Sequence, residues 1–199
     1  MLSSGNIIKD KIQQKGRGWI FFPTDFEGNN SPENIRQTLS RMVKQGEILR
    51  LSQGIYYYPR SNESLGIKVI YPTMEEVAQR VAERDGVKII PTGDYSLHKI
   101  GLSTQIPVNA VYITNGARKK ISLGKGKGII FKESNDFRIF GFISEVMMLA
   151  VSAMRTIGEK LISEEQIKHI KKIIKEIPEQ EYRHDILLAP VWVRKRLQD

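Results

Sequence analysis

The chain has 199 residues, of which 40% are hydrophobic, so it can form one large or two small domains around a buried core. It has no cysteine, which excludes disulfides, thiolate zinc sites and cysteine nucleophiles. No apolar run approaches the roughly 18 residues of a membrane helix, and the first six residues lack the basic and apolar regions of a signal peptide. We therefore expect a cytoplasmic protein without membrane contact.

The charge balance is the first specific indication of function. The chain carries 31 lysine and arginine residues against 22 aspartate and glutamate residues, which leaves a net charge of +9. A basic domain of this size often binds a polyanion, and nucleic acid is the commonest polyanion inside a cell. Many ordinary proteins are equally basic, so the charge by itself does not identify a binding surface.

Three short elements are predicted before residue 30. Residues 4–15 place isoleucines at helical spacing and are followed by Gly16, which ends the helix. Residues 19–22 form an apolar run that is too short for a helix and rich in strand-forming residues. Residues 23–26 are predicted to form a single helical turn.

A well-marked helix is predicted next. Ser31 is a suitable N-cap, Pro32 takes the favoured first position, and Gly46 follows the last turn. The apolar residues fall on one side of this helix, and the predicted buried stripe consists of Ile35, Leu39, Met42 and Val43.

Two strands, at residues 48–51 and 55–58, complete the first part of the chain. The turn Ser52-Gln53-Gly54 joins them, and its glycine can adopt a positive φ. Helix, strand, helical turn, helix and hairpin together predict a winged helix-turn-helix, in which the hairpin is the wing.

The rest of the chain predicts a second, mixed domain. A linker is expected at residues 61–72. The pattern after it predicts strands at 87–90, 109–114, 119–123, 129–131 and 137–140. Helices are predicted at 73–85, 94–100, 143–157, 163–174 and 179–199, the last broken near Pro190. The predicted fold class is therefore α+β. A winged-helix DNA-binding domain is expected at residues 1–65, and an α/β domain with a C-terminal helical segment at residues 66–199.

The buried stripe determines which residues of the second helix face solvent. In a helix-turn-helix the second helix lies in the major groove, where Gln and Asn suit adenine and Arg suits guanine or a phosphate. At 100° per residue, Gln37, Arg41 and Lys44 point away from the stripe, with Asn34 and Thr38 on one flank. The predicted DNA-binding residues of the helix are Asn34, Arg36, Gln37, Thr38, Arg41 and Lys44.

The wing supplies two further candidates. Arg50 enters the hairpin and Gln53 lies at its tip, so both are predicted to reach a phosphate or the minor groove. Tyr56 and Tyr58 share one face of their strand and Tyr57 the other, so we expect two of these rings to pack on the helices.

A second basic segment lies near residue 125. No acidic residue interrupts the stretch from Arg118 to Lys132, which includes a Gly-Lys-Gly-Lys-Gly turn. Such a block suits DNA backbone, RNA or an acidic partner, although a solvated loop has the same pattern. The candidate contacts are Arg118, Lys119, Lys120, Lys125 and Lys127.

The sequence predicts no catalytic residue, no metal site and no cofactor. The three histidines lack metal-ligand spacing, and Asp94 with His98, four residues apart, is more typical of a surface helical pair than of an acid/base pair. The glycines at 124–128 lack both the Gly-Lys-Ser/Thr order and the following helix of a phosphate loop, so they predict a hairpin turn.

Three segments carry a resemblance that covers nearly the whole chain. They are SPENIRQTLSRMVKQGEILRLSQGIYYYP, IIPTGDYSLHKIGLSTQIPVNAVYITNG and LLAPVWVRKRL. The first two resemble the AbiE-type abortive-infection antitoxins (AbiEi-like), and the third resembles the chain end of related bacterial proteins. The resemblance implies a transcriptional regulator that binds its own promoter and an antitoxin domain that opposes a nucleotidyltransferase-like toxin in phage defence, whether or not it contacts that toxin directly. Two alternatives stay open: an enzyme that processes nucleic acid or modifies the toxin, and a protein-interaction module without DNA binding.

Overall fold

The computed structural model describes residues 4–28 and 30–198, and these form an α+β protein. They divide into two compact units, Met1–Val81 with Ser122–Lys125, and Ala82–Ile121 with Gly126–Asp199. The sequence predicted a division near residue 65, whereas the first unit continues to Val81. Within the described ranges, no helix is long and apolar enough to cross a membrane.

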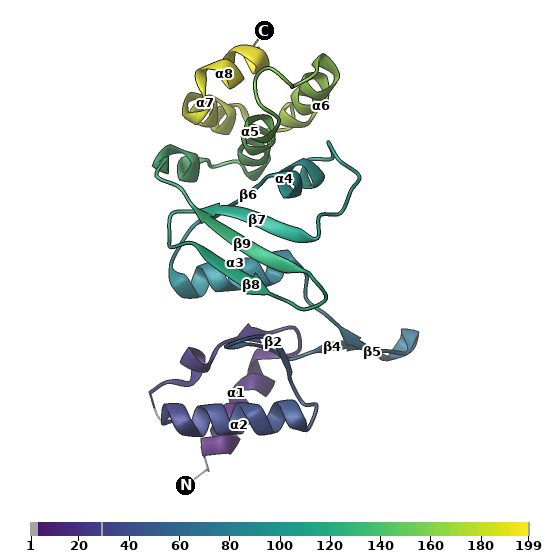
Figure 1. Cartoon of the computed structure of the whole chain (residues 1–199), viewed down its shortest axis with the longest axis vertical. Helices are drawn as coiled ribbons and strands as arrows, with labels where there is room; N and C mark the ends of the chain where they lie inside the picture. The colour runs from purple at the N-terminus through teal and green to yellow at the C-terminus, as the bar shows by residue number, and fades with distance from the viewer. Residues whose placement is uncertain (1–3, 29, 199) are drawn as a thin grey trace. The chain divides into compact units, whose positions relative to one another are not determined.

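The first unit opens with the elements that the sequence predicted, of which Figure 1 labels α1, α2 and β2. A three-stranded antiparallel sheet in the order β1-β3-β2 packs with two helices and a helical turn. The element bounds are α1 Ser4–Lys15, β1 Ile20–Phe21, η1 Pro23–Phe26, α2 Pro32–Lys44, β2 Leu49–Ser52 and β3 Ile55–Tyr57.

The core of this unit combines the predicted helical stripe with aromatic rings from the sheet. Ile35 and Leu39 of α2 are buried with Ile8 and Ile12 of α1. The Tyr56 ring lies 5.9 Å from that of Phe21 in the same cluster. Tyr57 is fully buried on the opposite face of β3, where its hydroxyl donates to the Ile70 carbonyl at 2.9 Å. Tyr56 and the half-buried Tyr58 pack against the cluster that contains the α1 and α2 residues, as expected for two of the three rings, whereas Tyr57 is buried on the other face of the strand.

The predicted linker at residues 61–72 is instead largely a hairpin. Strands β4 (Arg60–Asn62) and β5 (Ile67–Ile70) pair antiparallel around the 3₁₀ turn η2 (Glu63–Leu65). The Asn62 side chain accepts a hydrogen bond from the Leu65 backbone, and Gly66 has a φ of +66°. The linker prediction was wrong because this polar, glycine-containing sequence is also a suitable hairpin turn.

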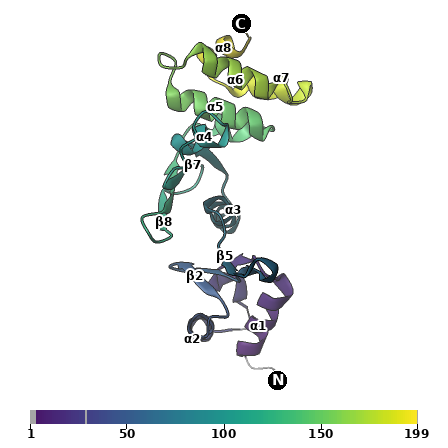
Figure 2. The same cartoon turned by 90° about the vertical axis from the view of Figure 1, so that its right-hand side faces the viewer.

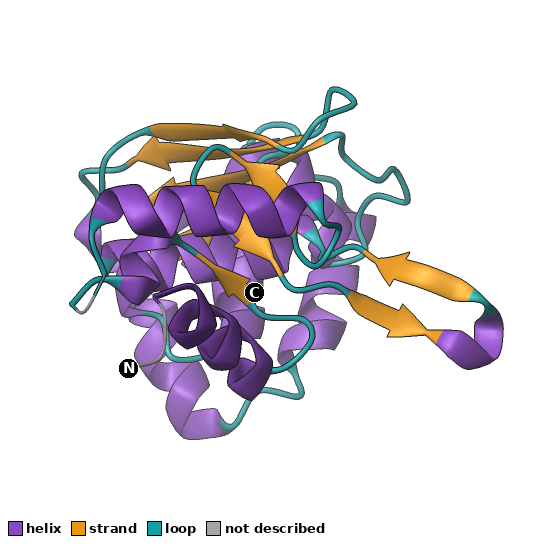
Figure 3. Cartoon of the chain, turned by 90° about the horizontal axis from the view of Figure 1, so that it is seen from below, coloured by secondary structure: helices purple, strands orange, loops and turns teal. Residues whose placement is uncertain are grey.

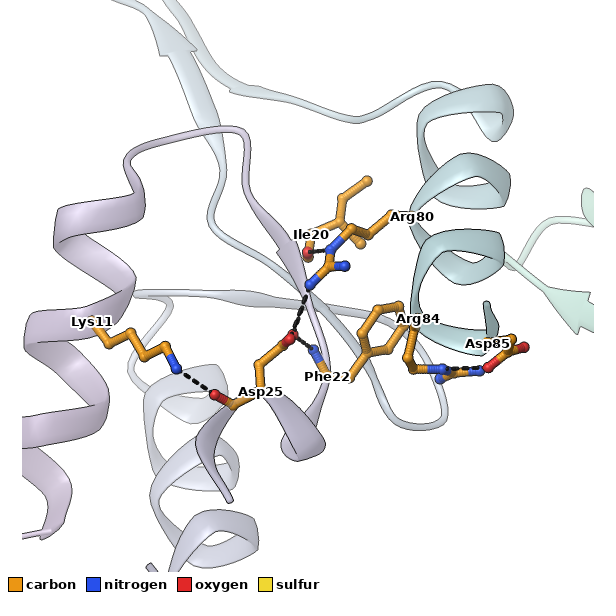
Figure 4. A network of polar contacts seen from close by, with 7 residues as sticks. All are labelled: Lys11, Ile20, Phe22, Asp25, Arg80, Arg84 and Asp85. Atoms are coloured by element: carbon orange, nitrogen blue, oxygen red, sulfur yellow. Dashed lines mark hydrogen bonds and ion pairs between the residues drawn. The ribbon is translucent and has the colours of Figure 1, made fainter. Parts of the chain in front are cut away.

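Helix α3 (Met74–Asp85) belongs to the first unit as far as Val81, and Figure 4 shows one contact that holds it there. The Arg80 guanidinium donates to the Ile20 carbonyl at 3.0 Å and to Asp25 at 2.9 Å, and lies over the Phe22 ring. Asp25 also accepts from the Phe22 backbone N–H at 2.8 Å. The unit therefore extends past residue 65 because α3 is hydrogen-bonded to β1 and η1.

We expect the Arg80→Ala substitution to destabilise this unit by about 1–3 kcal/mol, because it removes charge-assisted hydrogen bonds from partly buried partners. Chemical denaturation of the full chain measures this loss. Gln79→Ala, at an exposed neighbouring position, is the matched control. Equal unfolding midpoints for the two variants would show that the Arg80 contacts contribute no stability.

The second unit contains a four-stranded sheet in the order β6-β7-β9-β8. Strand β7 pairs antiparallel with β6 and parallel with β9. The predicted strands near 87–90, 109–114, 119–123 and 129–131 are confirmed with small shifts in bounds, as β6 Ile89–Thr92, β7 Asn109–Thr114, β8 Lys119–Ser122 and β9 Gly128–Glu133. The predicted strand at 137–140 is wrong: Phe137–Gly141 is a 3₁₀ helix, with Ile139 and Phe140 buried against Ile90.

The C-terminal half of the second unit is helical, as predicted. Met147 and Met154 lie fully buried among α5 and the helices that follow it. Asp185 is also fully buried, and its carboxylate accepts from the backbone N–H groups of Ile143 and Ser144, at the start of α5. The helices of the second unit after α3 are α4 Asp94–Lys99, which precedes β7, and α5 Glu145–Ile157, α6 Glu164–Ile174, α7 Glu179–Leu188 and α8 Val191–Gln198, which follow the sheet.

Candidate nucleic-acid interface

Helix α2 presents a polar and basic face to solvent. Ser31 caps its N-terminus by accepting from the Asn34 backbone at 3.3 Å, and Pro32 begins the first turn, as predicted. Because the apolar residues are buried on the opposite side, the remaining side chains are directed outward. The exposed predicted residues are Asn34, Arg36, Gln37, Arg41 and Lys44.

Thr38 does not belong to this face. The sequence placed it beside Gln37 as a base contact, but its side chain is only 7% exposed. The reason is its position three residues after Ile35 and four before Met42, which puts it at the edge of the buried stripe. Thr38 is therefore a core residue in this structure.

Two residues that the sequence reasoning missed lie on the same face. Ser40 lines a shallow depression together with Arg36, Gln37, Arg41 and Lys44. Glu33 accepts a hydrogen bond from the Gln37 amide at 3.3 Å and lies 3.9 Å from the Arg36 guanidinium. The helical wheel places both on the exposed side, so their spacing was sufficient to find them.

The β2–β3 hairpin carries the other two predicted contacts. Arg50 is exposed and opposite Tyr56 in the ladder, and Gln53 is exposed at the tip beside Gly54, which has a φ of +70°. Figure 2 looks along α2 and shows α2 and this hairpin toward one side of the first unit and α1 toward the other. Helix α2 and the hairpin thus lie toward the same side of the first unit.

Most of the positive charges of this surface are not neutralised within the described part of the chain, the exception being Arg36 beside Glu33. Arg41, Lys44 and Arg50 form no ion pair among residues 4–28 and 30–198, whereas Arg60, Arg80 and Lys9 each contact a carboxylate elsewhere in the unit. An exposed, unneutralised guanidinium or ammonium is a suitable group for a phosphate oxygen. The face therefore suits a polyanion.

The candidate cations of the basic segment near residue 125 do not all remain available for a partner. Arg118, Lys120, Lys125 and Lys127 are exposed, but the Lys119 ammonium pairs with the Asp85 carboxylate. Burial acts to raise the pKa of Asp85, and hydrogen bonds from Arg84 and Lys119 outweigh it, so that the pKa is lowered. Lys119 is thus engaged within the second unit, a contact that no local sequence pattern could indicate.

The backbone conformation of the turn between β8 and β9 explains why the turn contains glycines. Gly124, Lys125 and Gly126 have φ values of +81°, +49° and +75°, and strand β9 follows directly. The hairpin-turn prediction is confirmed.

Asp94 and His98, the other pair that the sequence singled out, share no hydrogen bond in the described part of α4.

Comparisons with known proteins identify a family and a similar solved structure. The model of DUF6088, described as a family of unknown function, matches residues 7–182. No curated protein matches the chain. The crystal structure of the RV2827C protein from Mycobacterium tuberculosis is similar, with a TM-score of 0.49 and 7% sequence identity over 100% of this chain and 82% of that chain.

Proposed function

We propose that this chain, which belongs to the DUF6088 family, is a sequence-specific DNA-binding transcriptional regulator whose first unit is a winged helix-turn-helix. The observation that carries the proposal is the exposed face of α2. It places Gln37, Arg41 and Lys44 together, with no ion pair on either cation in the described chain. Asn34 lies one turn earlier on α2 and is also exposed. Amide side chains suit adenine, and guanidinium groups suit guanine and phosphate.

In the proposed complex, α2 enters the major groove and the β2–β3 hairpin contacts the adjacent backbone. Groove-reading helices place their N-terminal residues deepest, so Asn34 and Gln37 read base edges. Arg41 reads guanine or holds a phosphate, and Lys44 contacts the backbone. Arg50 and Gln53 contact phosphate or the minor groove from the wing.

We further propose that the regulator acts on its own promoter and that the second unit serves as an antitoxin. This part rests on the resemblance of residues 31–59 and 89–116 to the AbiE-type antitoxins. The exposed cations Lys120, Lys125 and Lys127 of the β8–β9 hairpin support a contact with an anionic target, either a nucleotidyltransferase-like toxin or the nucleic acid that this toxin acts on.

The Arg50→Ala substitution separates backbone contact from base reading. If Arg50 neutralises one phosphate, the variant loses affinity about equally for all duplexes, and the slope of log K against log salt falls by roughly 0.9. Fluorescence anisotropy across a salt series measures both quantities, and Lys15→Ala, an exposed cation on α1, is the control. Loss on one sequence only, with the slope unchanged, would mean that Arg50 reads bases.

A further inference from the structure

Glu33 is the only acidic residue of α2. It lies three residues before Arg36 and four before Gln37, so the three side chains are neighbours on the surface of the helix. Glu33 Oε1 accepts a hydrogen bond from Gln37 Nε2 at 3.3 Å, and Glu33 Oε2 lies 3.9 Å from the Arg36 guanidinium. Both carboxylate oxygens therefore have a partner on the face that the proposed function assigns to DNA.

A carboxylate on this face opposes DNA binding in general. Its charge repels the phosphates that Arg41 and Lys44 attract, so it weakens affinity for every sequence. The helix dipole favours an acidic residue in the first turn, but that effect does not require the hydrogen bond to Gln37. A group that lowers general affinity while it contacts a base-reading side chain is suited to a role in specificity.

The hydrogen bond determines which way round the Gln37 amide lies. The amide oxygen only accepts and the amide nitrogen only donates, whereas an ionised carboxylate only accepts. Glu33 therefore binds the NH₂ end of Gln37, and the reversed amide would set Oε1 against the carboxylate. Without Glu33, the terminal torsion of a glutamine is broad and roughly two-fold, so neither orientation is strongly favoured.

The fixed orientation presents one donor and one acceptor to a base. A glutamine reads adenine through its oxygen, which accepts from N6, and through one N–H, which donates to N7. The other N–H points away from Oε1 and is the one that Glu33 holds during this contact. Guanine has the acceptor O6 where adenine has N6, so it would face Oε1 with a second acceptor. The same amide turned round would instead donate to that O6.

We propose that Glu33 is a positioning residue for base readout, which holds the Gln37 amide in the orientation that selects adenine over guanine. The Arg36 guanidinium, beside the other carboxylate oxygen, offsets part of the repulsion between Glu33 and the phosphates. This inference rests on the proposed function, because it names the base that the exposed face of α2 reads.

Selection of bound duplexes from a randomised library, followed by sequencing, gives the preference at every base pair and tests this role. We expect wild type to prefer adenine over guanine by about 5- to 150-fold at one base pair, the range for one bidentate contact. The new amide in Glu33→Gln can meet either end of the Gln37 amide, so the ratio should fall to about 3-fold or less at that pair alone. Gln37→Ala should lose its preference at the same base pair.

The matched control is Glu63→Gln, which makes the same charge change on η2, the helical turn at the tip of the β4–β5 hairpin (Figure 3). It should keep the wild-type ratio, and both glutamate variants should keep the wild-type unfolding midpoint. An unchanged ratio in Glu33→Gln, or a wild-type preference for another base at the Gln37 pair, would overturn the inference and leave DNA binding standing. A change at a different base pair from that of Gln37→Ala would also overturn it, because Glu33 would then read a base itself. Absence of any sequence preference in wild type would overturn the proposed function as well.

Discussion

Replacing Gln37 and Arg41 together by alanine is expected to weaken binding to the cognate duplex by roughly 2–6 kcal/mol, at about 1–3 kcal/mol for each base contact. Binding to a scrambled duplex should weaken much less, because only the backbone contacts remain there. The physical reason is that both side chains are exposed on α2 on the side opposite its buried stripe. Competition anisotropy on matched duplexes measures the difference.

Gln14→Ala is the control for this substitution, since Gln14 is an exposed glutamine on α1. Single variants at Gln37 and Arg41 are each expected to relax preference at one base pair rather than at the whole site. An unchanged ratio of cognate to scrambled affinity in the double variant would remove α2 from the reading role. The wing would then have to carry the specificity.

Reversing Lys120, Lys125 and Lys127 to glutamate is expected to abolish protection of cell growth against a co-expressed nucleotidyltransferase-like toxin. The three side chains are exposed on the β8–β9 hairpin and its turn, so the reversal should leave the unfolding midpoint close to that of wild type. Lys119 is left unchanged, because its loss would also break the ion pair with Asp85. Growth of cells that express both proteins is the measurement.

The matched control reverses Lys168, Lys172 and Lys175, three exposed lysines on α6 and at its C-cap. It makes the same change in net charge at a place outside the β8–β9 hairpin. Full protection by the hairpin variant, together with lost DNA binding, would assign the hairpin to the DNA contact surface instead. Equal loss of protection in both variants would show that total charge matters and not this hairpin.

Local patterns were sufficient to predict much of the first unit. Helix α2 has its cap at Ser31, its proline at the first position and its glycine just past the end, and each is a short-range effect. The turn at Gln53-Gly54 and the turn between β8 and β9 are likewise determined by residues that favour a positive φ. These predictions rest on chemistry within a few residues.

The predictions that failed depend on contacts between residues far apart in the sequence. The β4–β5 hairpin is held by Tyr57 and Glu76, and α3 joins the first unit through Arg80 and Asp25. Lys119 pairs with Asp85, 34 residues earlier. No local spacing pattern in the sequence predicts such long-range pairs. Thr38 differs, because the 100° wheel already placed it at the edge of the stripe, and its polarity alone led to the prediction of exposure.

The central claim is that the first unit binds double-stranded DNA in a sequence-specific manner, and one titration tests it most directly. The full chain is titrated against a duplex from upstream of its own reading frame and against a scrambled duplex of equal length, at about 50 and 200 mM salt. The proposal predicts affinity for the upstream duplex on the order of 10³-fold or more above the scrambled one, with both falling as salt rises. Equal, salt-insensitive affinity for the two duplexes, or no binding to either, would contradict it.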